Sequence, residues 1–168
     1  ANQLKTVSGS LDDVTISGTF DNKNNGTSKL VSAAIAGTEA YNYTLGTVSS
    51  ANVTQKIITA AGVSRVYDGS TSVNLSLNSI ESGDSVTGTG TFASKYVGTG
   101  ITISSGILAG TDAGNYNLTT ITAANITQRT VTGTGQNKVY NSLLTADVSL
   151  NNVVSGDNLT ISANFISK

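Results

Sequence analysis

The feature that most constrains this chain is that it repeats itself with a period of 73 residues. Residues 36–56 match residues 109–129 without a gap, with 12 of 21 positions identical. The same offset relates residues 57–95 to residues 130–168, with 14 of 39 positions identical. Self-similarity at a fixed period is typical of chains built from repeated structural units. We therefore expect a complete repeat at 57–129, an incomplete first repeat at 1–56 and an incomplete third repeat at 130–168, with borders that the period alone does not fix.

The composition excludes several classes of function. Lys and Arg number 9, Asp and Glu number 10, and together they make up 11% of the chain, against about 25% in an average globular domain. Without a basic cluster there is no counterion-release term for nucleic acid and no patch for anionic lipid. No apolar run approaches the roughly 20 residues that span a bilayer. We expect neither nucleic-acid binding nor membrane insertion by this segment.

The chain has no Cys, His or Met. It therefore lacks thiolate chemistry, the usual acid and base of neutral pH, and the commonest metal ligand. It also has no G-x-S-x-G motif, phosphate loop or marked carboxylate pair. The absence of oxidisable side chains suits an oxidising, exposed setting. We expect an extracellular or bacterial cell-surface protein without enzymatic activity.

Short stretches alternate apolar and polar residues, as Val73, Leu75 and Leu77 do, and this pattern predicts strands with one buried side. Turn pairs such as Asp68-Gly69 separate these stretches. In the complete repeat we predict strands near 57–61, 64–67, 73–79, 85–93, 101–107, 115–120 and 122–128. Such spacing favours an all-β fold of tandem, small β-sandwich-like modules. A β-helix is the alternative, although its coils repeat at about 20 residues.

The joins between repeats contain no Pro and keep strand-like alternation, at Gln55–Ile57 and again at Gln128–Thr130. We infer short, stiff joints in which one repeat runs into the next. This predicts an elongated arrangement of modules.

Three blocks carry a family resemblance: Val66-Tyr67-Asp68-Gly69, then Ser82-Gly83-Asp84, then the segment 109–118 with Asp112, Asn115 and Tyr116. Their order resembles the YDG-type and mostly-beta glycine-rich (MBG) repeats of large bacterial surface proteins, including haemagglutinin-like adhesins of two-partner secretion. The resemblance implies stalk or adhesive modules and no catalytic residue. The third repeat departs from it, with Tyr140-Asn141-Ser142 in place of Tyr-Asp-Gly, and the first has Glu39-Ala40-Tyr41 where the complete repeat has Asp-Ala-Gly.

The acidic turns are the candidate binding sites. Asp68, Asp112 and Asn115, with Glu39, offer oxygens that suit calcium. Calcium needs six or more oxygens, and no D-x-D-x-D-G run is present, so we favour ordinary turns and expect no cofactor. Four tyrosines and three phenylalanines recur at equivalent places, and we predict that they fill the module cores: Tyr43, Tyr67, Tyr116, Tyr140, Phe20, Phe92 and Phe165.

Two functions remain open. The first is a repeat segment of a bacterial adhesin, acting as a stiff stalk or a multivalent array whose partner is a host or surface glycan or protein. The alternative is self-association: a subunit of an extracellular filament, a head-to-tail homopolymer in which incomplete repeats complete one another by strand addition.

Overall fold

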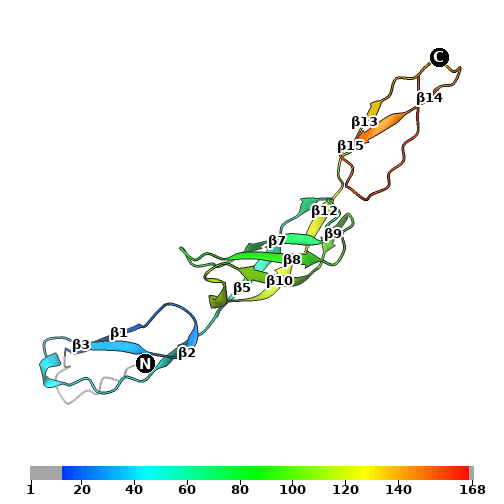
Figure 1. Ribbon diagram of the computed structural model, residues 1–168. Coiled ribbons are helices and arrows are strands. Elements are labelled where there is room, and N and C mark those ends of the chain that lie inside the picture. Colours follow the sequence, from blue (N-terminus) through cyan, green and yellow to red (C-terminus); the bar gives the residue numbers. More distant parts are fainter. Residues whose placement is uncertain (1–12, 167–168) are drawn as a thin grey trace. The chain divides into compact units, whose positions relative to one another are not determined.

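The computed structural model describes residues 13–166 (Figure 1). Its contacts divide the chain into two compact units. The first unit holds residues up to Ile57 together with Thr111–Asn117. The second unit holds Ile58–Gly110 and the chain from Leu118 onwards.

Two sheets form the centre of the second unit. The larger has the strand order β10-β8-β7-β5-β11, and the smaller has the order β6-β12-β9. The strands of the larger sheet are β5 (Lys56–Gly62), β7 (Ser72–Leu77), β8 (Thr87–Phe92), β10 (Ile103–Ala109) and β11 (Tyr116–Thr122). Those of the smaller are β6 (Arg65–Val66), β9 (Gly98–Ile101) and β12 (Ala124–Thr127). Burial alternates along β8, where every second residue is buried, as period-2 patterning requires.

Side chains from both sheets meet in one core. Ala60, Val73, Leu75 and Phe92 come from the larger sheet, and Ala124 and Ile126 come from the smaller. Phe92 is the largest of them and is 2% exposed. Gly88 and Gly90 lie beside this core because a Cβ on either would come within 3 Å of a neighbouring side chain. The two glycines therefore let β8 approach its neighbours closely.

The first unit contains two pairs of strands. Strand β1 (Thr15–Phe20) pairs with β3 (Val31–Ala36), and β2 (Gly26–Lys29) pairs with β4 (Ala51–Val53), both antiparallel. Two three-residue 3-10 turns, η1 (Ala40–Asn42) and η2 (Ala113–Asn115), also belong to this unit.

The pairings in the first unit repeat those of the second. Thr15 lies opposite Ala36 as Thr87 lies opposite Ala109, and in each pair the threonine hydroxyl donates to the alanine carbonyl, over 3.3 and 3.4 Å. Gly26 lies opposite Val53 as Gly98 lies opposite Ile126. Strands β1 to β4 are thus the counterparts of β8, β9, β10 and β12.

The offset between these counterparts changes from 72 to 73 residues along the repeat. It is 72 from Phe20 to Phe92 and 73 from Ala36 to Ala109. The extra residue is Ser104, which stands at a register shift between Ile103 and Ser105 in the pairing of β10 with β8. Its hydroxyl donates to the carbonyl oxygen of Thr91 over 3.3 Å. This one-residue irregularity is a β-bulge.

Residues 130–166 carry a different set of counterparts. Strand β13 (Thr132–Gly135) pairs with β15 (Val148–Asn151), in the register of β5 and β7. Strand β14 (Thr145–Ala146) pairs with β16 (Ala163–Asn164), in the register of β7 and β8. These residues therefore match the first half of the complete repeat.

The predicted all-β class is confirmed, with a nearly closed sheet. The strands predicted in the complete repeat form within a few residues of their expected bounds, except that 101–107 divides between β9 and β10 at Thr102. The predicted burial of aromatic residues is confirmed for Phe92 and Tyr116. It is wrong for Tyr43, Tyr140, Phe20 and Phe165, which are exposed, because the described parts of the first and third repeats lack strands that cover the equivalent positions in the complete one.

Candidate functional site

The tyrosine of the Tyr-Asp-Gly segment lines a groove of about 430 Å³ in the second unit. The other walls are residues 128–131, which follow β12, and the segment around Asn152 and Asp157. Apolar side chains alternate with polar ones in the lining, and they include Val97, Val131, Val153, Val154 and Leu159.

The polar groups of this groove are paired with one another. The Tyr67 hydroxyl donates to Asp157 Oδ1 over 3.1 Å. Arg129 Nε donates to the carbonyl oxygen of Asn152 over 2.8 Å, and the Asn152 amide donates to the carbonyl oxygen of Thr130 over 2.8 Å. Asn152 has a φ of +67°, a conformation that Asn tolerates better than most residues. These contacts fix the segment after β12 against the turn that follows β15.

The hydrogen bond to Asp157 raises the pKa of Tyr67 above its ordinary value of 10.0, and burial and the Asp157 charge act in the same direction. Both the acceptor and the nearby charge favour the neutral phenol. A pKa raised in the folded state gives a stabilising contribution that is complete below pH 10 and is lost as the pH rises through the folded value.

We predict that Asp157→Ala lowers the Tyr67 pKa. Ultraviolet titration of phenolate formation measures it, and a Tyr67→Phe variant identifies which part of the curve belongs to Tyr67. The wild-type residue should titrate after the Asp157→Ala residue. Identical curves for the two proteins would show that the hydrogen bond does not persist in solution.

Asp68 and Gly69 form a structural turn. Asp68 Oδ1 accepts a hydrogen bond from the Ser70 amide over 2.9 Å, and Gly69 has a φ of +80°. The Ser70 amide, and after it the neighbouring Arg65, lower the pKa of Asp68 from its ordinary value. Arg65 forms an ion pair with Asp68 and donates to the carbonyl oxygen of Ser70. Its guanidinium also lies 5.5 Å from the centre of the Phe92 ring, which ties the turn to the core.

The other calcium candidates lie in the first unit. Asp112 forms an ion pair with Lys23 over 2.8 Å. Asn115 Oδ1 accepts from the Asn25 amide over 2.9 Å, and the Asn115 amide donates to Asn24 over 3.2 Å. Asp112 and Asn115 thus share the turn η2, whereas Asp68 belongs to the other unit. Within residues 13–166, no three His, Cys, Asp or Glu side chains come together as a possible metal site. No helix in this part of the chain is long and apolar enough to span a membrane.

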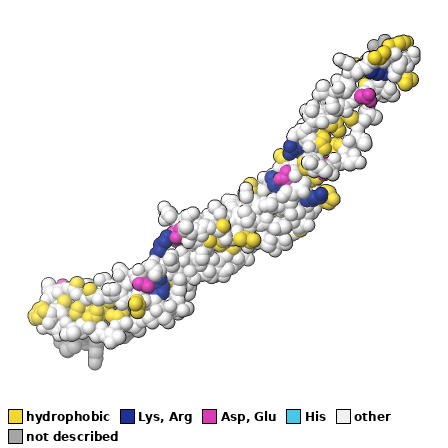
Figure 2. Space-filling model, in the orientation of Figure 1, with side chains coloured by type: hydrophobic (Ala, Val, Ile, Leu, Met, Phe, Trp, Pro, Cys, Tyr) yellow, Lys and Arg dark blue, Asp and Glu magenta, His cyan; other side chains and the backbone are white. Residues whose placement is uncertain are grey.

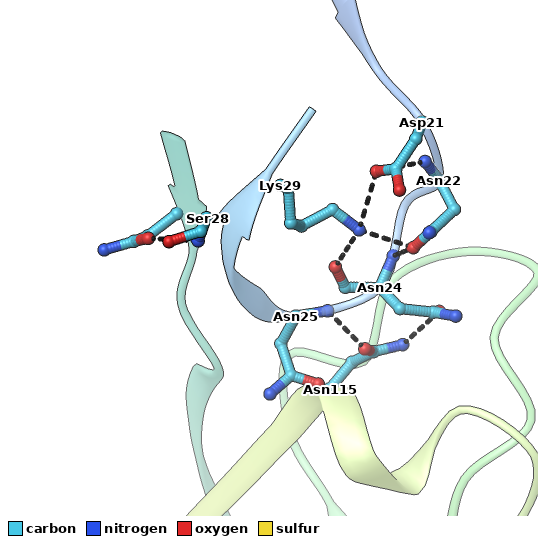
Figure 3. A network of polar contacts seen from close by, with 8 residues as sticks. Asp21, Asn22, Asn24, Asn25, Ser28, Lys29 and Asn115 are labelled. Atoms are coloured by element: carbon cyan, nitrogen blue, oxygen red, sulfur yellow. Dashed lines mark hydrogen bonds and ion pairs between the residues drawn. The ribbon is translucent and has the colours of Figure 1, made fainter. Parts of the chain in front are cut away.

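Lys29 is a buried lysine that sequence reasoning did not single out. Its ammonium donates to Asn22 Oδ1 and, over 2.9 Å, to the carbonyl oxygen of Asn24, and it lies 3.4 Å from Asp21 Oδ1 (Figure 3). In the complete repeat the counterpart of Lys29 is Ile101, which packs against the core. Three acceptors from one loop therefore hold a charge where the complete repeat has an apolar side chain.

Replacing Lys29 with isoleucine should stabilise the first unit by about 1 kcal/mol, because buried ion pairs often yield stability when apolar residues replace them. The Lys29→Ala control should destabilise it, since alanine leaves the space of the lysine stem empty. Hydrogen exchange of the β2 and β4 amides measures both effects. Equal losses in the two variants would mean that the polar network itself holds the loop.

The face of the molecule in Figure 2 carries few Lys, Arg, Asp and Glu side chains, scattered among uncharged ones. Arg65, Arg129 and Asp157 were not predicted as site residues. The sequence repeats Asp157 as Asp84 and has Lys56 at the position of Arg129, but neither match indicates a partner. Tyr67 and Asp157 are 90 residues apart, and no local pattern links them.

A family comparison bears on the same segment. The model of the YDG domain matches residues 50–124, a range that includes the Tyr67-Asp68-Gly69 turn, the core strands and η2. No curated protein and no solved structure matches the chain. A YDG domain is therefore found at residues 50–124 of this chain.

Proposed function

We propose that this chain is a structural or adhesive repeat segment of a bacterial cell-surface or secreted adhesin. It would act as a stiff stalk or as a multivalent array. The observation that carries the proposal is the recurrence of the same strand registers in the first unit, the YDG domain and residues 130–166. A chain that repeats one small fold gains length and valency with each copy.

Short connections support the stiffness in this proposal. Two residues, Thr54 and Gln55, separate β4 from β5, and residues 128–131 separate β12 from β13. The Gln55 side chain donates to the carbonyl oxygen of Gly114 over 2.9 Å, and Arg129 is held by Asn152. Side chains on both connections are thus tied to neighbouring segments, and flexible Gly/Ser or extended Pro-rich linkers are absent from both.

The paired polar groups and the lack of His and Cys support a role without catalysis. In the groove, Tyr67, Arg129 and Asp157 stabilise the fold around them, and we propose no catalytic residue among them. An array of many weak sites gains avidity without any one strong pocket. The scarcity of charged side chains suits contact with an uncharged polar partner such as a glycan, and exposure at the cell surface.

Small-angle scattering of the dilute chain tests the stalk. A compact domain of this length has a radius of gyration of about 15 Å. We expect a clearly larger value, and a matched variant with Gly-Ser repeats inserted after Thr130 should give a broader distribution of distances. A radius near the compact value, unchanged by the insertion, would contradict the stalk. Glycan-array probing with the chain displayed at high density then separates an adhesive array, which binds, from a pure spacer, which does not.

A further inference from the structure

Strand β1 has an open edge and an exposed apolar side. In the larger sheet its counterpart β8 lies between β10 and β7, whereas β1 pairs with β3 alone among the described residues. Ile16 and Phe20 on β1 are 47% and 43% exposed, whereas Phe92 at the end of β8 is 2% exposed. Figure 2 shows hydrophobic side chains gathered over the part of the molecule that holds β1 and β3. An edge of this kind is a template for another strand.

Residues 130–166 have the opposite deficiency. They contain counterparts of β5 and β7, and their counterpart of β8 is poorly formed: of residues 160–165, only Ala163 and Asn164 are in a strand. Ile161 and Phe165 in this segment are 51% and 42% exposed. Counterparts of β9, β10 and β12 do not occur in residues 130–166. The first unit has well-formed counterparts of all four of these strands, β8 included.

The sequence of β1 also fits this place better than that of β8 does. Residues 15–20 read Thr-Ile-Ser-Gly-Thr-Phe, residues 160–165 read Thr-Ile-Ser-Ala-Asn-Phe, and both have Ile where β8 has Gly88. In the complete repeat, Gly88 leaves room for Leu75 and Leu77.

The third repeat has smaller residues around the same place. Gly133 stands at the position of Ala60, and Val148 stands at the position of Leu75. A Cβ on Gly133 would lie 3.9 Å from Ile161 Cδ1 and 2.7 Å from Val148 Cγ1, so glycine here admits the larger neighbours. Ile16 has the size that this space accommodates. The match in volume favours β1 as the strand that packs here.

We propose that β1 of one molecule pairs with β14 and β15 of a second molecule, in the antiparallel register of β8 with β7. That register places Thr19 opposite Thr145, Gly18 opposite Ala146, Ser17 opposite Asp147, and Ile16 opposite Val148. Strand β1 takes the place of residues 160–165 and brings β2, β3 and β4 with it. The composite has the counterparts of β5, β7, β8, β9, β10 and β12 in one domain.

This partner is a second copy of the chain, and the contact is heterologous. Each molecule offers one β1 edge and one β14–β15 edge, so association continues head to tail unless a ring closes. The inference goes beyond the stalk function and does not depend on it, because a chain can be stiff and monomeric or flexible and polymeric.

Light scattering with matched variants tests the contact. The mass of the wild-type chain should rise with concentration above 17.0 kDa. Ile16→Asp should keep the chain monomeric, because the carboxylate would be buried at the contact. Ser17→Asp makes the same change on the opposite face of β1, where the β8 counterpart Thr89 is exposed, and should associate like wild type. An unchanged unfolding midpoint of the YDG domain confirms that both variants fold. A wild-type chain that stays monomeric, or equal behaviour of the two variants, would overturn the proposal.

Disulfide trapping tests the register, since the chain has no Cys of its own. Ser17→Cys mixed with Asp147→Cys and a mild thiol oxidant should give the mixed dimer, because directly opposite residues have Cα atoms about 4.5–5.5 Å apart. Thr19→Cys mixed with Asp147→Cys is the control on the same face, two residues out of register and about 7–8 Å away. Equal trapping in both mixtures would show that β1 does not dock in this register.

Discussion

Replacing Phe92 with alanine should destabilise the YDG domain by about 3–5 kcal/mol, a large part of the stability of a small domain. The ring is 2% exposed and packs where the two sheets of the second unit meet. Alanine leaves a cavity there and removes the ring over which the Arg65 guanidinium lies at 5.5 Å. Urea unfolding followed by circular dichroism measures the loss.

The repeat supplies the control for this substitution. Phe165 occupies the same position in the third repeat but is 42% exposed. Phe165→Ala, measured at low concentration where molecules do not associate, should cost under about 1 kcal/mol because little apolar area returns to water. A Phe92→Ala chain as stable as Phe165→Ala would mean that the packing between the two sheets is looser than the structure shows.

Gly110→Ala should destabilise the chain by about 3–4 kcal/mol, from backbone strain and steric overlap together. Gly110 has a φ of +118°, which disfavours any residue with a Cβ. An added Cβ would lie 3.2 Å from Val86 Cα and would overlap the carbonyl group of Ser85. Because that obstacle is backbone at the start of β8, a side-chain rotation cannot relieve it.

Gly114→Ala is the matched control four residues later. No heavy atom lies within 4 Å of a Cβ built on Gly114, and its φ is not positive. Urea unfolding should show a change within about 0.5 kcal/mol. If both variants lose the same stability, the cost at Gly110 comes from the general loss of glycine rather than from contact with Ser85.

Alternation was sufficient to predict most strands of the complete repeat. Val73 and Leu75 are buried and Asn74 between them is exposed, because a strand turns successive side chains to opposite faces. The Asp68 turn was also predictable, since Asp and Gly have local roles that do not depend on the rest of the chain.

Contacts between distant residues were not predictable in the same way. The burial of Phe92 and the exposure of Phe20 have one sequence pattern, and they differ only because β7 covers β8 and does not cover β1. The same holds for the Tyr67–Asp157 hydrogen bond and for Lys29, whose buried place depends on β4 and on the loop that surrounds its ammonium. Pairing between strands decides these features, and periodicity within one strand does not report it.

The bulge at Ser104 determines how such repeats are to be counted. A strict search at 73 residues does not align residues 14–20 with 86–92, although 5 of these 7 positions are identical at an offset of 72. The additional residue is accommodated outside the ladder, so inward-facing side chains before and after it stay inward. Copies that differ in length by one residue at this point therefore share one fold. An alignment that permits a gap there, and nowhere else, detects copies that a fixed ruler misses.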